Sequence, residues 1–244
     1  PHAVDWRGDD WAPSNEEPAA HPNARFTAPA RQCPVISSDW ENPNGVPIDI
    51  FVFGGRRSQV APLVLESFDW DHGVYLGASA SSETTAANIG AVGALRYDPF
   101  AMLPFSGYNM GDYIGHWLAM GDRLGENAPR IFRVNWFRKG PDDRWLWPGF
   151  GENARVLKWM CERVAGSAGA RETAVGRMPE SGVLDLTGLD LPNEDLEELF
   201  AVDTDAWRRE TAELREYFAQ YGDRLPARLK TQLEAQASRL EGAD

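Results

Sequence analysis

Cysteine and lysine are both scarce in this chain of 244 residues. Its two cysteines, Cys33 and Cys161, are far apart and form no CxxC pair, which argues against a disulfide scaffold and a cysteine-rich zinc site. We therefore expect a reducing, cytoplasmic setting. Only three of the 24 basic residues are lysines (Lys139, Lys158 and Lys230), so most of the positive charge is carried by guanidinium groups, which bind carboxylates and phosphates through paired hydrogen bonds.

Long apolar runs and excess positive charge are missing as well. No run approaches the roughly 18 residues of a membrane-spanning helix, and the opening PHAVDWRGDDW lacks the basic and apolar stretches of a signal peptide. The 37 acidic and 24 basic residues give a net charge of −13, which repels a nucleic-acid backbone. We expect neither a membrane nor a nucleic-acid polymer as partner. The polar start without Met indicates a piece of a longer protein, whose active site would be incomplete here.

Several catalytic motifs are also absent. There is no GxSxG elbow, so nucleophilic hydrolysis has no support, and no GxxxxGK[ST] loop, so bound phosphates would need another cradle. The four histidines (His2, His21, His72 and His116) lack the i, i+4 spacing of a helical metal site. We expect no metal ligand from them.

What is present indicates a globular protein of mixed structure. Hydrophobic residues make up 43% and charged residues 25% of the chain, and its length allows one or two domains. We expect an α/β (mixed α+β) fold in which residues 1–184 carry the central β-structure and 185–244 form a helical tail packed on it. Strands are predicted at 48–55 (buried), 61–67, 73–79 and 131–137. Helices are predicted after Asn109, at 154–165 with Val156, Leu157, Met160 and Val164 inward, from a capping Asn193, at 205–221 and after Pro226.

The first candidate site is FGGRR at 53–57, where two glycines leave a strand and two arginines follow. Glycines let backbone amides approach a ligand, and Arg56 or Arg57 would supply a guanidinium whose paired N–H groups bind an anion. The alternative is a tight turn with salt-bridged surface arginines. A second candidate is HPNARF at 21–26, where Asn23 and Arg25 suit a small carboxylate or phosphate, unless the segment is an ordinary polar loop.

The most distinctive segment is NWFRKGPDDRWLWPGFGEN at 135–153. The rings of Phe137, Trp145 and Phe150 can stack on a planar base, and Asn153 offers a donor and an acceptor for a base edge. The alternative is an aromatic core cluster in which Asn153 is only a helix cap.

The stretch SSETTAANIGAVGA at 81–94 contains mostly small side chains. Few large apolar groups anchor it, so it could open and close over a site as a lid. An alanine-rich buried helix is the other interpretation.

Together, six strings resemble the C-terminal portion of the GTP-dependent phosphoenolpyruvate carboxykinases, and the likeness spans nearly the whole chain. They are HPNARF, GVPIDIFVFGGRR, SETTAA, YDPFAMLPFSGYNMGDYIGHWL, IFRVNWFRK and WLWPGFGENARVLKW. The resemblance implies the nucleotide-binding lobe of an enzyme that decarboxylates oxaloacetate to an enolate and transfers the γ-phosphoryl group of GTP to it. The products are phosphoenolpyruvate, GDP and CO2, in a gluconeogenic step, and the enzyme is expected to be a cytoplasmic monomer.

The resemblance also assigns roles to residues. Arg25 would be catalytic, between substrate and transferring phosphoryl group, with Asn23 binding substrate and Arg56 the nucleotide phosphates. A guanine slot would consist of Phe137, Trp145, Phe150, Gly151, Glu152 and Asn153. A lid would consist of Thr84, Thr85, Ala86, Ala87, Asn88, Ile89 and Gly90, and would shield the enolate from protonation.

Two departures from the family pattern affect these expectations. Ser81 stands where some relatives carry Arg, and Trp145 stands where relatives often have Phe, a tolerable change for stacking. The family's phosphate loop, reactive cysteine and manganese ligands would lie upstream of residue 1, with Mg2+ accompanying GTP, so this chain alone should not catalyse. The rival hypothesis is a non-catalytic module that binds carbohydrates or nucleotides through its tryptophans.

Overall fold

The computed structural model describes residues 3–21, 24, 27–84 and 93–243. The chain divides into two compact units. One consists of Pro1–Pro47 with Thr85–Val92, and the other of Ile48–Thr84 with Gly93–Asp244. Among the described residues, no helix combines the length and the apolar character needed to cross a bilayer.

The first unit has little regular structure in its described part. β1 (Ala3–Val4) and β2 (Asp10–Trp11) form an antiparallel pair, and η1 (Ala30–Gln32) is a short 3-10 helix. Most of its described side chains are exposed. The frequent Pro, Gly and Asn residues of this segment account for the irregular backbone.

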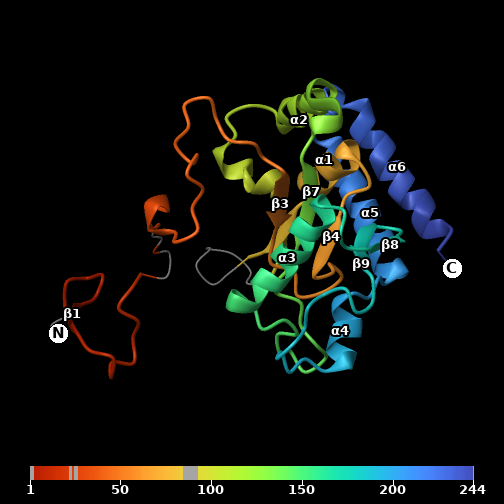
Figure 1. The fold of residues 1–244 in the computed structure, drawn as a ribbon. Helices are drawn as coiled ribbons and strands as arrows, with labels where there is room; N and C mark the ends of the chain where they lie inside the picture. Colours follow the sequence, from red (N-terminus) through yellow and green to blue (C-terminus); the bar gives the residue numbers. More distant parts are fainter. Residues whose placement is uncertain (1–2, 22–23, 25–26, 85–92, 244) are drawn as a thin grey trace. The chain divides into compact units, whose positions relative to one another are not determined.

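The second unit is built on a mixed five-stranded sheet in the order β3-β7-β4-β9-β8 (Figure 1). Its strands are β3 (Ile50–Gly54), β4 (Val64–Glu66), β7 (Arg130–Val134), β8 (Ala170–Thr173) and β9 (Gly176–Pro179). β3 pairs with β7 in parallel, and the other neighbours are antiparallel. A separate hairpin joins β5 (Ser81–Glu83) to β6 (Leu95–Tyr97). The predicted mixed α/β class is confirmed, as are the strands expected at 61–67 and 131–137.

The strand expected at 48–55 exists, but the prediction that it is buried is wrong. Among the described residues β3 lies at the edge of the sheet, next to β7 alone, and Val52 is exposed. A continuous apolar run is typical of a strand covered on both faces. At an edge the same run is only half covered.

Residues 73–79 are helical, which corrects the strand predicted there. α1 spans Trp70–Ala78, and the carboxylate of Asp69 caps it by accepting a 2.7 Å hydrogen bond from the backbone N–H of His72. A Cβ on Gly73 would lie 2.5 Å from Cδ1 of Ile131 in β7. The glycine that looked like a strand boundary is therefore the place where α1 packs closely on the sheet.

Helices cover both faces of the sheet. Phe132 and Val134 of β7 belong to a buried cluster with Trp159 of α3 (Asn153–Val164), whereas α1 contacts Ile131, which points to the other face. The helix expected at 154–165 is confirmed, but Leu157 is exposed, contrary to prediction. Trp159 takes the inward position instead.

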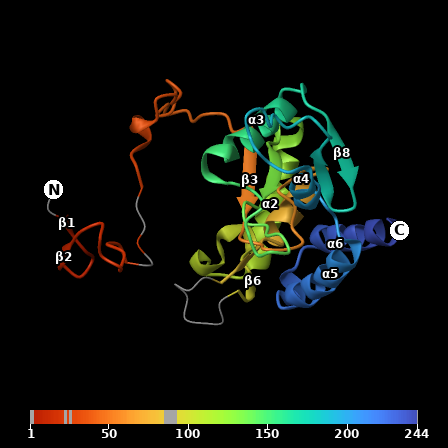
Figure 2. The same ribbon diagram turned by 90° about the horizontal axis from the view of Figure 1, so that it is seen from below.

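The remaining helices were largely anticipated. They are α2 (Met110–Leu124), α4 (Asn193–Leu199), α5 (Thr204–Ala219) and α6 (Ala227–Glu241), and Figure 2 shows α5 and α6 side by side. Asn109 caps α2 as predicted, because its Oδ1 accepts a 2.8 Å hydrogen bond from Gly111 N–H. Asn193 does not cap α4, which begins after Pro192 without a side-chain cap. Short 3-10 helices are η2 (Pro99–Ala101), η3 (Leu103–Phe105), η4 (Gly125–Asn127), η5 (Phe150–Glu152) and η6 (Gly222–Arg224).

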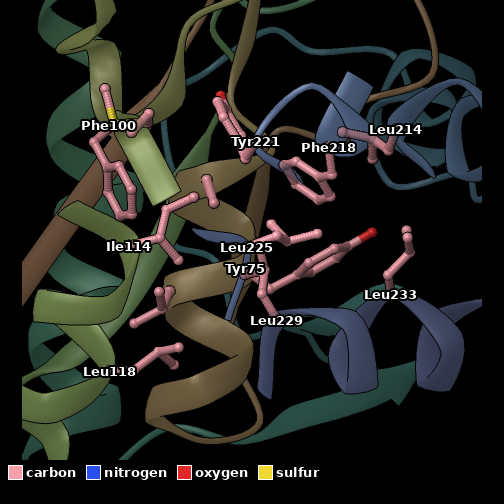
Figure 3. Packing of buried hydrophobic residues seen from close by; sticks show 13 residues of the cluster. Tyr75, Phe100, Ile114, Leu118, Leu214, Phe218, Tyr221, Leu225, Leu229 and Leu233 are labelled. Atoms are coloured by element: carbon pink, nitrogen blue, oxygen red, sulfur yellow. The ribbon is translucent and has the colours of Figure 1, made fainter. Parts of the chain in front are cut away.

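The C-terminal helices share one core with α1 and α2. Figure 3 shows this cluster, in which Tyr75 of α1 and Ile114 of α2 pack with Phe218 of α5 and Leu229 of α6. Burial of such side chains contributes roughly 1.5–3 kcal/mol each. The residues after 204 therefore contribute to the hydrophobic core of the second unit.

His72 should make the protein less stable in mild acid. Its side chain is fully buried, Nδ1 accepts a 3.0 Å hydrogen bond from Phe68 N–H, and burial together with the charges of Arg239 and Arg177 lowers its pKa to about 3. Unfolding restores the ordinary value near 6.5, so the unfolded chain binds more protons below that pH, and stability falls as pH drops from 6.5 towards 3. We expect an extra loss of about 2 kcal/mol between pH 7 and pH 5.

Urea unfolding at both pH values measures this loss. His72→Leu should show a smaller decrease, whereas His116→Gln, at an exposed position, should keep the wild-type decrease. An identical pH dependence in wild type and His72→Leu would contradict the assignment.

Candidate functional site

The backbone after β3 is held close to the β5–β6 hairpin. A Cβ on Gly55 would lie 2.1 Å from the carbonyl oxygen of Ser81, so only glycine fits at this position. The N–H of Arg56 donates to Oγ of Ser82 at 3.1 Å, and the N–H of Glu83 donates to the carbonyl of Arg56 at 2.8 Å. The carboxylate of Glu83 then accepts from the N–H and the hydroxyl of Ser58, at 2.7 and 2.6 Å. We call residues 54–58 the anion loop.

The two arginines of the anion loop lie in different surroundings. Arg57 is 5% exposed, and its guanidinium donates to Oγ of Ser81 at 2.9 Å and forms an ion pair with Glu210 of α5. Arg56 is exposed, and no carboxylate in the described part of the chain forms an ion pair with it. Of the two arginines in the FGGRR pattern, Arg57 has a structural partner, whereas Arg56, which the resemblance assigns to the nucleotide phosphates, has no ion pair among the described residues.

A further buried cation lies close enough to Arg57 of this loop to interact with its charge. Arg133 of β7 is buried, and burial together with the charge of Arg57 lowers its pKa to about 10, while Glu210 opposes the shift. Arg133 therefore stays protonated at neutral pH, so two buried guanidiniums share Glu210. This favours an anion near the loop.

A cavity of about 280 Å³ is lined by residues of the anion loop and of the aromatic segment, residues 135–153. Its walls include Gly55 and Arg56 from the loop, Ser82 from β5, and Trp136 and Phe137 from the segment after β7. The structure thus places the predicted phosphate arginine and the first predicted stacking ring on the same cavity.

The three predicted rings are only partly brought together. The rings of Phe137 and Trp145 lie 5.7 Å apart, edge to face, and Lys139 Nζ lies 4.6 Å from the centre of the Trp145 ring. Trp145 is 52% exposed, which leaves much of its surface available. Phe150 is 99% exposed, has a positive φ of 48°, and makes no ring contact within the described residues. These rings are not the closed core cluster considered from the sequence.

The base-edge residues lie where η5 runs into α3. Asn153 is the first residue of α3, and its Oδ1 accepts a 2.9 Å hydrogen bond from Nε1 of the buried Trp147. It is not a helix cap, because the cap position is Glu152. Glu152 pairs with Arg155, and Gly151 is exposed. The indole fixes the Asn153 side chain.

Some predicted site residues lie outside the described part of the chain. They are Asn23 and Arg25, and the lid residues Thr85, Ala86, Ala87, Asn88, Ile89 and Gly90. Thr84 is described: its N–H donates to the carbonyl of Ala94 at 2.9 Å, and its carbonyl accepts from Gly93 at 3.0 Å. Ser81, at the departure from the family pattern, binds Arg57.

Sequence reasoning missed two residues beside the site. Nothing in the sequence distinguishes Glu210 from the other acidic residues of the helix expected at 205–221, although its side chain is 13% exposed and pairs with Arg57. Asn135 opens the candidate segment at 135–153 but receives no role in the site expected from the sequence, although it is buried. An amide directly between the apolar residues Val134 and Trp136 was the available signal for Asn135.

The described residues contain no group of three or more His, Cys, Asp or Glu side chains that could hold a metal ion. The resemblance puts the expected manganese ligands upstream of residue 1, so this result does not test that expectation. The roles assigned here to Arg56, Phe137 and Asn153 require no metal ligand.

Comparison with known proteins identifies the family. The family model of the phosphoenolpyruvate carboxykinase C-terminal P-loop domain matches residues 1–239. A protein of Treponema pallidum (strain Nichols) named phosphoenolpyruvate carboxykinase [GTP] is 49% identical over 251 residues, which cover 99% of this chain and 40% of the relative.

Two further relatives carry the same name. That of Anaeromyxobacter dehalogenans is 50% identical over 240 residues, covering 98% of this chain and 40% of the relative. That of Chlamydia caviae is 49% identical over 231 residues, covering 94% of this chain and 38% of the relative. The chain thus spans about two fifths of the length of the relatives it matches. With a family model matched from residue 1 to residue 239, this chain belongs to the family of the phosphoenolpyruvate carboxykinase C-terminal P-loop domain.

Proposed function

We propose that the polypeptide containing this chain is a GTP-dependent phosphoenolpyruvate carboxykinase. The structural observation that supports this most directly is the cavity shared by Arg56 and Phe137, since a nucleotide needs a cation for its phosphates and a ring for its base. The relatives named for this activity support the specific reaction.

The reaction takes oxaloacetate and GTP to phosphoenolpyruvate, GDP and CO2. Breaking the bond to the departing carboxylate leaves an electron pair on the enolate, whose oxygen then attacks the γ-phosphorus while the β–γ bridging oxygen leaves with GDP. Such a transfer requires positioning and neutralisation of charge more than covalent assistance. Arg56 would neutralise phosphate charge, and Arg25 and Asn23 would hold substrate.

The guanine would stack on Phe137 and Trp145, with Phe150 as a third ring. Asn153, Gly151 and Glu152 would read its edge, and residues 84–90 would exclude water from the enolate. The Mn2+ and Mg2+ ions, the cytoplasmic setting and the monomeric state belong to this proposal as expectations from the resemblance.

The test is formation of phosphoenolpyruvate from oxaloacetate by the longest natural polypeptide that includes this sequence, with manganese and either GTP or ATP. Product with GTP alone would support both the reaction and the guanine slot. No product with either nucleotide would contradict the proposal and favour a non-catalytic binding module.

Asn153→Asp should reduce the preference for guanine over adenine. Because Oδ1 already accepts from Trp147, the free Nδ2 is the group available to donate to guanine O6, and aspartate removes that donor while keeping an acceptor for the indole. We expect the ratio of kcat/KM for GTP over ATP to fall about tenfold, an effect of roughly 1.4 kcal/mol.

Trp147→Phe tests the indole separately, because it removes the hydrogen bond that fixes the Asn153 side chain but keeps the amide able to donate. It should lower stability more than base preference. Full discrimination in Asn153→Asp would exclude Nδ2 as a reader of the base.

A further inference from the structure

Asn135 is buried, and both the oxygen and the nitrogen of its side-chain amide form hydrogen bonds. It follows β7, is 1% exposed, and its own N–H donates to the carbonyl of Leu63 at 3.0 Å. Its Nδ2 donates to the carbonyl oxygens of Arg57 at 2.8 Å and Ala61 at 2.9 Å. Its Oδ1 accepts from the backbone N–H groups of Arg57 and Phe137, both at 3.2 Å. The amide therefore makes four hydrogen bonds, all to backbone groups.

These backbone partners belong to two different parts of the proposed nucleotide site. Arg57 directly follows Arg56 in the anion loop, and the amide binds both its N–H and its carbonyl. Phe137 carries the first stacking ring, and it binds the same Oδ1. The Asn135 side chain thus links the backbone next to Arg56 to the backbone of Phe137.

We propose that Asn135 is a positioning residue that sets the spacing between the phosphate subsite at Arg56 and the base subsite at Phe137. The inference rests on the proposed function, and the ligand class is a purine nucleoside polyphosphate. When two subsites bind two parts of one ligand, the second contact forms at a high effective concentration only if the spacing is correct. A rigid link in the free protein removes the cost of ordering the two segments on binding.

The spacing role predicts a specific pattern of affinities. A linked ligand, GTP, gains from correct spacing, whereas guanosine or tripolyphosphate occupies one subsite and gains nothing from it. Replacing a residue that merely stabilised the fold, or that served one subsite alone, would not selectively weaken the affinity for GTP. The ratio of the GTP affinity to the affinities of its two parts is therefore the diagnostic quantity.

The variant is Asn135→Asp, which keeps the size of the side chain but replaces the two Nδ2 donors by an acceptor facing two carbonyls. In the longest natural polypeptide that includes this sequence, we expect the Kd for GTP to rise about tenfold. The Kd values for guanosine and for tripolyphosphate should each change less than about twofold. Asn135→Ser, a smaller polar side chain, should show the same pattern if Asn135→Asp does not fold.

Gln236→Glu is the matched control. Gln236 is another 1% exposed amide, its Nε2 donates to Oγ1 of Thr211 at 3.0 Å between α6 and α5, and the same exchange of NH2 for O is made there. It should lower the melting temperature without changing the affinity ratio.

A folded Asn135→Asp or Asn135→Ser protein with the wild-type ratio, or with all three affinities reduced alike, would overturn the positioning role and leave the proposed function standing. A wild-type polypeptide that binds no GTP would overturn the proposed function and this inference together.

Discussion

Replacing Arg56 with alanine is expected to lower kcat/KM for GTP by about 100-fold, which corresponds to roughly 2.7 kcal/mol and to the loss of a hydrogen-bonded charge contact to phosphate. The guanidinium is exposed on the wall of the cavity and has no carboxylate partner among the described residues, so its charge is available to a ligand. Because the side chain supports no other part of the described fold, stability should change by less than about 0.5 kcal/mol. Steady-state kinetics and thermal unfolding measure the two effects.

Two variants make the Arg56 result specific. Arg56→Lys keeps the charge but loses the planar fork, so it should recover only part of the activity. Arg123→Ala removes another exposed arginine, in the last turn of α2, and should leave the kinetics unchanged. Wild-type GTP kinetics in Arg56→Ala would remove Arg56 from the phosphate site.

Much of the fold could be predicted because local patterns dominate it. The stripe of Trp207, Thr211, Leu214, Phe218 and Tyr221 in α5 and its neighbourhood recurs at helical spacing, and these side chains are buried. The failure at α1 has a physical cause. Val74 and Tyr75 favour a strand by propensity, but the local cap at Asp69 and the tertiary packing of Gly73 against Ile131 together stabilise a helix and override propensity.

The site shows the same division between local and long-range information. The sequence pointed to FGGRR and to the aromatic segment at 135–153, yet this local pattern could not decide between Arg56 and Arg57, and only the family resemblance favoured Arg56. That decision depends on Glu210, which is 153 residues from Arg57 along the chain. Nor could it show that Asn135 reaches back 78 residues to the anion loop. Contacts over such separations leave no periodic signal in one sequence.

Glu210→Ala should destabilise the protein by about 3–5 kcal/mol, because it leaves Arg57 charged and buried without its partner. Arg133 would lose the same nearby negative charge, which adds to the cost. For a chain of this length, the melting temperature should fall by roughly 6–20 °C. Glu213→Ala, at an exposed position one turn further along α5, should cost less than about 0.5 kcal/mol and serves as control.

The double variant Arg57→Leu with Glu210→Leu separates the ion pair from simple loss of packing. If losing Glu210 leaves an uncompensated buried charge, removing Arg57 as well should restore part of the stability that Glu210→Leu alone loses, because two apolar side chains leave no charge to desolvate at that place. Recovery should be incomplete, since Arg133 remains charged beside them. Additive losses in a double-mutant cycle would show that the two side chains do not interact. A measurable coupling would mean that helix α5, through Glu210, holds the residue that follows Arg56, so that the C-terminal helices contribute to the geometry of the proposed phosphate site.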